Sequence, residues 1–317
     1  MTTPIAIADK AAKLFFYGLV LTAPACGGGS GGSGGDAAPN PAPPPPPAAF
    51  VYEVPEDRGD TWSVANAPTQ GMDVAALESM MEAVFAGDFD VIDSIAIARG
   101  GELVFDETIR TRLVDNDAQV GNAELAMHAQ FSVSKSITSL VVGIAIDQGF
   151  IAGVDVPYLS LFPYTGYENW DERKNDITLE HVLTMQLGLQ WDEFDPPYSS
   201  PDNQWNRFYF NEHDFSKALL DLPMASDPGT EFAYNTAATV SLGQAVENSV
   251  PLTLDDFGIS ELKLPIAITE IEVTRKPTGL SNGGVGFYLR TRDSERFGLL
   301  LVNEGTWNAE RFVSSEW

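Results

Sequence analysis

Ser132 and Lys135 combine the residue types and the spacing of a nucleophile and its base. Residues three positions apart share one face of an α-helix. The apolar residues that follow recur at helical spacing and are Ile137, Leu140, Val141, Ile144 and Ala145. We therefore expect a buried helix that carries both polar side chains at its N-terminal end, which is the arrangement that a serine nucleophile activated by a lysine needs. In the alternative interpretation, Ser132 caps the helix and Lys135 lies on a solvated face.

A second Ser-x-x-Lys sequence, at residues 260–263, lacks this context. A chain of this length contains roughly one such match by chance. Pro265 would end a helix almost directly after the second lysine, and no long apolar run follows. Only Ser132 precedes such a run, so Ser132 and Lys135 are the candidate pair.

Other catalytic and metal-binding patterns are missing from the sequence. The histidines are scattered, at His128, His181 and His213, and neither a His-x-x-x-His sequence nor a cysteine pair suggests a metal. No Gly-x-Ser-x-Gly elbow joins a strand to a helix, as a Ser-His-Asp hydrolase would require. The acidic residues contain no pair that stands out as glycosidase carboxylates. We expect neither a metal nor a cofactor.

The charge of the chain excludes some classes of partner. It has 45 Asp and Glu against 18 Lys and Arg, which gives a net charge of −27 over 317 residues. Such an acidic surface disfavours binding to nucleic acid and polybasic attachment to anionic lipid. A hydrophobic content of 44% is typical of soluble globular proteins, and the length allows one large domain or two intermingled ones.

Residues 1–26 have the form of an export signal. Two lysines precede an apolar run at residues 14–21, which is too short to span a bilayer and is typical of a signal-peptide core. Small residues then lead to Cys26, the only cysteine in the chain. This arrangement resembles a bacterial lipoprotein signal, in which Cys26 would be lipidated. The alternative is simple secretion, with Cys26 as a free cysteine near an ordinary cleavage site.

Residues 27–49 predict a tether between that signal and the folded part of the chain. They are first rich in Gly and Ser, which favours flexibility, and then rich in Pro, which favours an extended chain. A tether after a lipid anchor would hold a domain clear of a membrane. We therefore expect an exported protein, periplasmic or at the cell surface, that contacts the membrane through the lipid anchor only.

Residues 50–317 are predicted to form the globular domain that positions the candidate pair. The expected elements are a helix from Asp73 to Phe85, a hairpin of residues 94–99 and 102–106, the Ser132 helix as far as residue 148, a helix at 178–185, a helix after Thr236, a strand at 283–289, and helices at 291–301 and 313–317. We expect no strand between residues 150 and 230, and residues 250–280 have no clear pattern. This order predicts an α+β fold, in which helices flank an antiparallel sheet and a mainly helical insertion interrupts it.

Residues 191–210 are loop-rich and contain many aromatic residues. They are Trp191, Phe194, Tyr198, Trp205, Phe208, Tyr209 and Phe210. Such residues could line a substrate cleft or could simply pack the loop, and the residue types do not decide between the two. We take Trp191 and Tyr198 as candidate substrate-binding residues.

Four segments, in this order, resemble the serine hydrolases related to class C β-lactamases and penicillin-binding proteins. They are residues 132–135, 183–189, 228–236 and 292–298. Residues 197–203 are similar to the branch that contains 6-aminohexanoate-dimer hydrolase and related esterases. The resemblance covers about residues 70–317 and implies a β-lactamase/transpeptidase-like fold.

The resemblance also implies a role for individual residues. Ser132 would attack an ester or amide carbonyl, and the helix N-terminus would stabilise the resulting oxyanion. Lys135 would accept the serine proton in its uncharged form. Tyr234 matches the tyrosine of the Tyr-x-Asn motif, which acts with the lysine as base and then protonates the leaving group. Thr236 replaces the asparagine of that motif and Asn235 precedes it, and both are candidate substrate-binding residues.

The third motif of the family, Lys/His-Thr/Gly-Gly, has no counterpart in the sequence. In the family it lies on a strand that follows the helix matched by residues 292–298, whereas Gly283 and Gly284 precede that helix. We therefore expect this chain to be a C-terminally shortened member. Such a chain would catalyse poorly and would expose an unpaired strand edge.

Three functions remain open at this point. The first is an envelope-associated serine hydrolase that cleaves small esters or amides. The second is a D-amino-acid-specific peptidase of the penicillin-binding type, and the third is a non-catalytic envelope module that binds ligands in the same cleft. Turnover of short-chain esters separates the first from the third, whereas activity confined to D-amino-acid peptides favours the second. The sequence indicates no oligomeric state.

Overall fold

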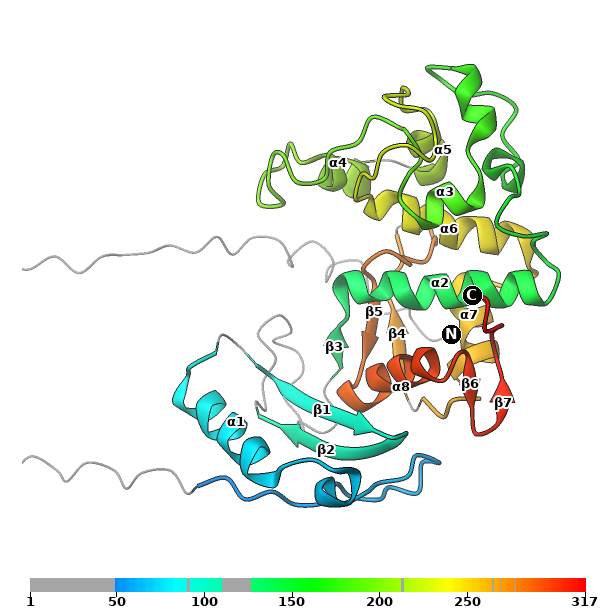
Figure 1. Cartoon of the computed structure of the whole chain (residues 1–317). Helices are drawn as coiled ribbons and strands as arrows, with labels where there is room; N and C mark the ends of the chain where they lie inside the picture. The colour runs from blue at the N-terminus through cyan, green and yellow to red at the C-terminus, as the bar shows by residue number, and fades with distance from the viewer. Residues whose placement is uncertain are drawn as a thin grey trace, which may run out of the picture. The chain divides into compact units, whose positions relative to one another are not determined.

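A computed structural model describes residues 49–89, 92–109, 127–211, 214–263, 265–268, 270–276 and 278–317 (Figure 1). The predicted signal, Cys26 and nearly all of the predicted tether lie outside the described residues. The chain divides into two compact units. Among the described residues, the first contains 49–53 and 73–89, and the second contains 54–72 and those from 92 onwards. Among the described helices, none is both long enough and apolar enough to cross a bilayer.

Helix α1 (Val74–Ala86) belongs to the first unit and begins as predicted. The Asp73 carboxylate accepts a hydrogen bond from the Ala75 backbone N–H, which makes Asp73 the N-cap. The ring of Phe85, near the end of the helix, lies 6.3 Å from that of Phe50. This contact holds the preceding extended chain against α1.

Strands β1 (Ser94–Arg99) and β2 (Glu102–Thr108) form the predicted antiparallel hairpin. Gly100 and Gly101 both have positive φ, which a two-residue turn of this kind requires. Helix α8 (Thr291–Val302) packs against β1.

A three-stranded antiparallel sheet has the order β3 (His128–Ala129), β5 (Phe287–Leu289) and β4 (Ile271–Val273). Leu289 pairs with His128 on one side and with Ile271 on the other. The strand predicted at 283–289 is therefore confirmed only for its last three residues. Strand β4 was not predicted, nor was the hairpin of β6 (Thr306–Trp307) and β7 (Glu310–Arg311).

The middle of the second unit is helical, as predicted. Its helices are α3 (Leu179–Leu183), α4 (Gln204–Asn211), α5 (Phe215–Leu220), α6 (Thr236–Ser249) and α7 (Leu254–Gly258), with 3₁₀-helical turns at Tyr158–Leu161 and Glu172–Asp176 and a π-helical turn at Ile259–Lys263. A further 3₁₀ turn, Ala67–Gln70, lies near the start of the unit. The aromatic stretch at residues 191–210, which was expected to be loop-rich, includes most of α4. The antiparallel strands, the flanking helices and the mainly helical middle confirm the predicted α+β architecture.

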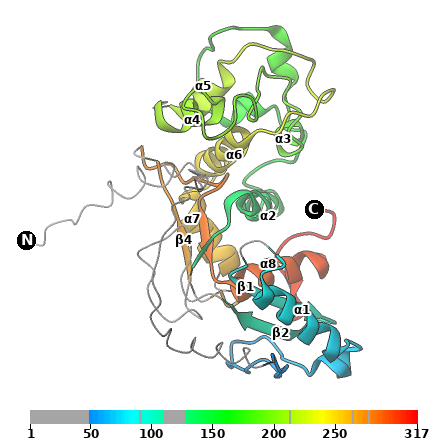
Figure 2. The ribbon, with the colours of Figure 1, turned by 90° about the vertical axis from the view of Figure 1, so that its left-hand side faces the viewer.

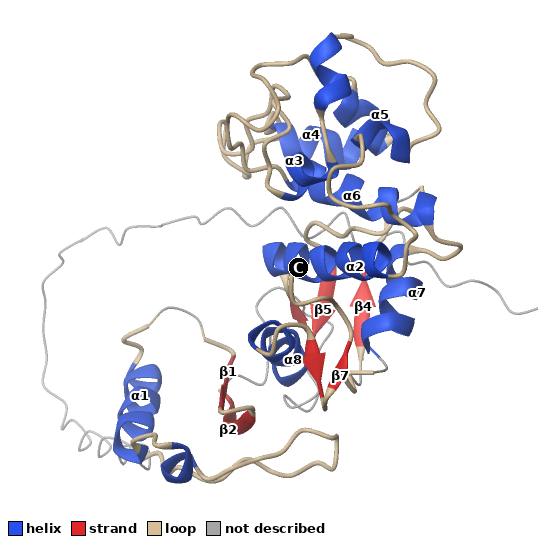
Figure 3. Cartoon of the chain, turned by 45° about the vertical axis from the view of Figure 1, so that its right-hand side comes forward, coloured by secondary structure: helices blue, strands red, loops and turns tan. Residues whose placement is uncertain are grey.

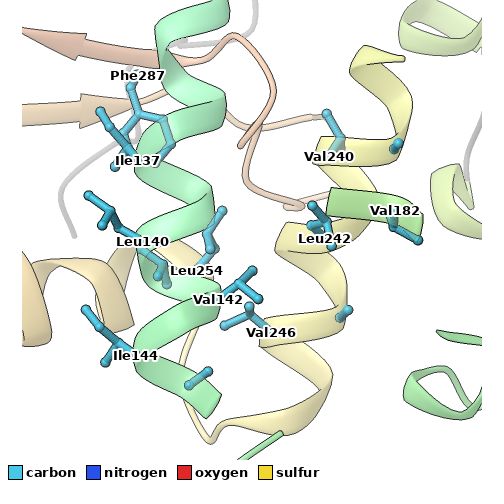
Figure 4. Packing of buried hydrophobic residues seen from close by; sticks show 14 of the residues in the cluster. Ile137, Leu140, Val142, Ile144, Val182, Val240, Leu242, Val246, Leu254 and Phe287 are labelled. Atoms are coloured by element: carbon cyan, nitrogen blue, oxygen red, sulfur yellow. The ribbon is translucent and has the colours of Figure 1, made fainter. Parts of the chain in front are cut away.

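Helix α2 (Ser134–Asp147) is the centre of the second unit. Helices α3 to α6 gather on one side of it and the three-stranded sheet on the other (Figures 1 and 2), and Figure 3 shows the same separation by secondary structure. Buried Val142 of α2 faces Val246 of α6 across the interface in Figure 4. Burial of one such side chain contributes about 1.5 to 3 kcal/mol, so α2 is a firm support for the residues at its N-terminus.

Residues 313–317 were predicted to be helical, and this prediction is wrong. The chain there is a turn, in which the Ser314 N–H donates to the Asp147 carboxylate at 2.6 Å. The Trp317 ring packs on Gly143 so closely that an added Cβ would lie 2.7 Å from it. Contacts with Gly143 and Asp147 of α2 thus hold these residues in place where a helix was expected.

Candidate active site

Ser132 lies in a tight turn between β3 and α2. The turn is a 3₁₀ segment, Phe131–Val133, and Phe131 has a φ of 42°. Val133 is the N-cap of α2 and makes no side-chain cap, so Ser132 does not cap the helix. The turn leaves Ser132 exposed, which is what a nucleophile needs.

Three predicted catalytic residues meet at the Ser132 hydroxyl. Lys135 Nζ donates a hydrogen bond to Ser132 Oγ at 3.1 Å, and the Tyr234 hydroxyl donates another at 2.7 Å. Lys135 Nζ also lies 5.0 Å from the centre of the Tyr234 ring. Both donors are half-buried, whereas Ser132 faces solvent. One hydroxyl thus has two proton-transfer partners and an open side.

Lys135 is held in place by the loop that precedes β5. Its Nζ donates to the Gly284 carbonyl at 3.0 Å, and the Thr138 hydroxyl donates to the Gly283 carbonyl at 2.8 Å. Gly284 has no room for a side chain, because an added Cβ would lie 2.8 Å from Cγ2 of Thr236. The loop therefore has to be glycine here for its carbonyl to reach the lysine.

Tyr234 is placed by the segment that leads into α6. The Asn235 side chain is the N-cap of α6 and accepts from the Ala238 N–H at 2.8 Å. The Ala233 N–H donates to the Met185 carbonyl at 3.0 Å. Tyr234 is therefore fixed between a capped helix and the turn after α3.

Glu193 is a buried acid beside this segment that sequence reasoning missed. It is 1% exposed and accepts hydrogen bonds from the Thr236 N–H at 2.6 Å, the Tyr198 hydroxyl at 2.7 Å and Trp191 Nε1 at 3.2 Å. The Thr236 hydroxyl also donates to it. Burial and the bond to Glu193 raise the pKa of Tyr198, which keeps that hydroxyl protonated as a donor. In the sequence, Glu193 resembles an ordinary surface acid next to Asp192.

The predicted substrate-binding residues differ in their access to the site. Trp191, Asn235 and Thr236 are buried, and the polar contacts of their side chains are internal. Tyr198 is 37% exposed, and Phe194, which was not proposed, is 60% exposed. The ring of Phe194 lies 5.5 Å from that of Tyr234 and 6.0 Å from that of Tyr198. Direct substrate binding by the four predicted residues stays a prediction.

The other chemical groups considered in the sequence have structural partners. His181 completes a capping box with Thr178 at the start of α3, and the Ser260 hydroxyl donates to the Phe257 carbonyl at 2.9 Å. Across the described ranges, no group of three or more His, Cys, Asp or Glu side chains is arranged to hold a metal. His213 lies outside those ranges.

Comparison with protein families gives one match. The family described as Beta-lactamase matches residues 91–257, which is more than half of the chain. A search of curated proteins finds no match.

Solved structures with the same fold come from several kinds of protein. A candidate 6-aminohexanoate-dimer hydrolase from Bacillus anthracis is 19% identical with a TM-score of 0.55, over 71% of this chain and 57% of its own. The octameric penicillin-binding protein homologue from Pyrococcus abyssi is 18% identical with a TM-score of 0.58, over 77% and 59%. EstCE1, a hydrolase with promiscuous acyltransferase activity, is 15% identical with a TM-score of 0.54, over 74% and 72%. The chain thus spans less than two thirds of the length of the first two proteins. The likeness is one of fold, and it confirms the predicted β-lactamase/transpeptidase-like fold.

Proposed function

The chain belongs to the beta-lactamase family, and we propose that it is a serine hydrolase that cleaves small esters or amides through an acyl-enzyme on Ser132. One observation carries this proposal, namely the convergence of Lys135 Nζ and the Tyr234 hydroxyl on Ser132 Oγ, at 3.1 and 2.7 Å. These distances are within the range over which a proton can be transferred directly.

The reaction would proceed in two halves. Ser132 Oγ attacks the carbonyl carbon while its proton passes to uncharged Lys135, directly or through Tyr234. The oxyanion forms at the N-terminal end of the helical segment, where backbone N–H groups and the helix dipole favour negative charge. Tyr234 then protonates the departing alcohol or amine and takes back a proton from Lys135, which is uncharged again. In the second half, water attacks the acyl-enzyme and gives a proton to the Lys135 and Tyr234 pair. The bond between the acyl carbon and Ser132 Oγ then breaks, the acid leaves, and the same proton restores the Ser132 hydroxyl.

Apolar side chains around Ser132 favour uncharged substrates. Phe131 and Val133 are 53% and 54% exposed and flank the serine in sequence, and Phe194 stands beside the Tyr234 ring. An apolar alcohol or acyl group can bury this surface when it binds. A peptide with a free carboxylate gains less from it, so esters and amides are the first substrates to test.

A direct experiment compares three substrates: a short-chain p-nitrophenyl ester, a D-alanyl-D-alanine peptide and a chromogenic β-lactam. We expect ester turnover by wild type and by Ser136→Ala, which alters an exposed serine of α2, and none above background by Ser132→Ala. Turnover of the peptide alone would favour the peptidase. Ester turnover that survives in Ser132→Ala would refute the proposed nucleophile.

The envelope location is a proposal that rests on residues 1–49. Growth of the source cells with labelled palmitate should label wild type and not Cys26→Ala. Absence of label from wild type would remove the lipid anchor from the proposal without touching the hydrolase.

A further inference from the structure

We propose that Glu193 is a positioning residue for the reaction, whose carboxylate fixes the segment from Tyr234 to Thr236 and thereby aims the Tyr234 hydroxyl at Ser132. This inference rests on the proposed function. It concerns a side chain that does not touch the reacting atoms and acts through its neighbours.

The first argument is the number of donors that meet at this one carboxylate. Its Oε2 accepts from the Thr236 N–H at 2.6 Å and from Trp191 Nε1 at 3.2 Å. Its Oε1 accepts from the Tyr198 hydroxyl at 2.7 Å and from the Thr236 hydroxyl. An ionised carboxylate accepts hydrogen bonds and cannot donate one. The arrangement of four donors around one side chain is therefore suited to a carboxylate anion. Hydrogen bonds to a charged group are stronger than neutral ones.

The second argument is the way the buried charge is compensated. Among the described residues, no Lys, Arg or His forms an ion pair with Glu193. Its partner is instead Thr236, the first residue of α6, where the helix dipole favours an anion. A buried charge is costly without such partners. Glu193 therefore fixes the position of the α6 N-terminus, which lies two residues after Tyr234.

Two connections run from Glu193 to Tyr234. The shorter one passes along the backbone from Thr236 to Tyr234. The longer one passes through Tyr198, whose ring contacts Phe194, and Phe194 in turn lies beside the Tyr234 ring. Glu193 thus constrains Tyr234 from the backbone and from the side of its ring.

Capping of α6 does not explain the arrangement, because Asn235 already supplies the side-chain cap through the Ala238 N–H. Loss of Glu193 would leave that cap in place. We therefore expect a displaced Tyr234 hydroxyl rather than a lost helix.

The test is a double-mutant cycle between Glu193→Gln and Tyr234→Phe, measured as ester turnover. Glutamine keeps the size of the side chain but presents an N–H₂ group to one pair of donors. We expect kcat to fall about tenfold to a hundredfold in Glu193→Gln, as for a small misplacement of a reacting group, with KM within about twofold. In the Tyr234→Phe background the same substitution should change kcat little, because the hydroxyl that it positions is absent.

Two further variants make the outcome decisive. Glu180→Gln alters an exposed acid of α3 and should equal wild type. Thr236→Val removes one donor but keeps the shape of the side chain. It should lower kcat below that of wild type, but by less than Glu193→Gln does. If Glu193→Gln does not fold, a wild-type kcat in Thr236→Val would overturn the positioning role.

Equal kcat in wild type and Glu193→Gln, a rise in KM alone, or an equal loss in both backgrounds would overturn the positioning role and leave the proposed function intact. Absence of Ser132-dependent turnover in wild type would instead refute the proposed function, and the positioning role with it.

Discussion

Tyr234 donates a 2.7 Å hydrogen bond to Ser132 although the two residues are 102 positions apart in the chain. Lys135 reaches the same oxygen from one helical turn away. The site therefore combines one contact that local spacing supplies with one that only the packing of α6 against α2 can supply. Substitutions that remove one of these two contacts and leave the other measure what each contributes to catalysis.

Tyr234→Phe should lower kcat for esters by about a hundredfold to ten-thousandfold, the usual range for loss of a general acid or base. The ring stays and keeps its contact with Phe194, so the thermal unfolding midpoint should change little. Stopped-flow measurement of the first turnover detects the loss in acyl-enzyme formation. An unchanged rate of that step would contradict the assigned role.

Lys135→Arg should be nearly inactive although it keeps the charge and the ability to donate hydrogen bonds. Arginine cannot lose its proton in a protein, so it cannot take one from Ser132. We expect kcat at least a hundredfold below wild type, with a normal circular dichroism spectrum. Activity within tenfold of wild type would mean that Lys135 acts by charge alone.

Gly284→Ala should lower activity by displacing the carbonyl that holds Lys135. The added Cβ would lie 2.8 Å from Cγ2 and 3.0 Å from the carbonyl oxygen of Thr236, so the loop has to move. We expect a loss of at least about tenfold in kcat, as for a small error in placement. Thr236→Ser removes the nearer of the two contacts and should restore part of the activity. Wild-type kcat in Gly284→Ala would show that this carbonyl does not matter.

Glu295 should make stability depend on pH. Burial, followed by the effect of Asp106, raises the pKa of Glu295 from 4.5 to about 7, and its Oε2 atom is buried without a hydrogen-bond partner among the described residues. A raised pKa means that the folded state holds the proton more tightly than the unfolded state. The contribution of protonated Glu295 to the free energy of unfolding is therefore complete below about pH 4.5, and it is lost as the pH rises through about 7.

Glu295→Gln should remove this dependence. Its free energy of unfolding relative to wild type should increase by about 1 to 2 kcal/mol between pH 4 and pH 8, a range that allows for partial solvent screening. Urea unfolding at both pH values measures the change, and Glu272→Gln, at an exposed position of β4, serves as the control. Parallel pH profiles for wild type and Glu295→Gln would contradict the assignment.

Helix α2 could be predicted because its signal is local. Ser132 and Lys135 lie one turn apart, and the apolar face that follows matches the buried side chains of the helix. The hairpin around Gly100 could likewise be predicted, because its strands and turn are formed by residues adjacent in sequence. The ordered motifs also predicted the family, and with it the meeting of Tyr234 with the other two residues.

The remaining features depend on partners that are distant in sequence. Glu193 is bonded to Thr236, 43 positions away, and no spacing rule marks an acid for burial. Strand β4 has only three residues, Ile271–Val273, and its pattern is too short to recognise. The helix predicted at the end of the chain is wrong because Trp317 packs against Gly143 instead, a contact that no local propensity contains.

The most direct measurement is to label the protein with a fluorophosphonate and to locate the adduct by mass spectrometry in wild type, Ser132→Ala and Ser136→Ala. A serine activated by Lys135 and Tyr234 should be modified in wild type and in Ser136→Ala, on the peptide that contains Ser132, and there should be no adduct in Ser132→Ala. An adduct on another residue, or one that persists in Ser132→Ala, would contradict the account.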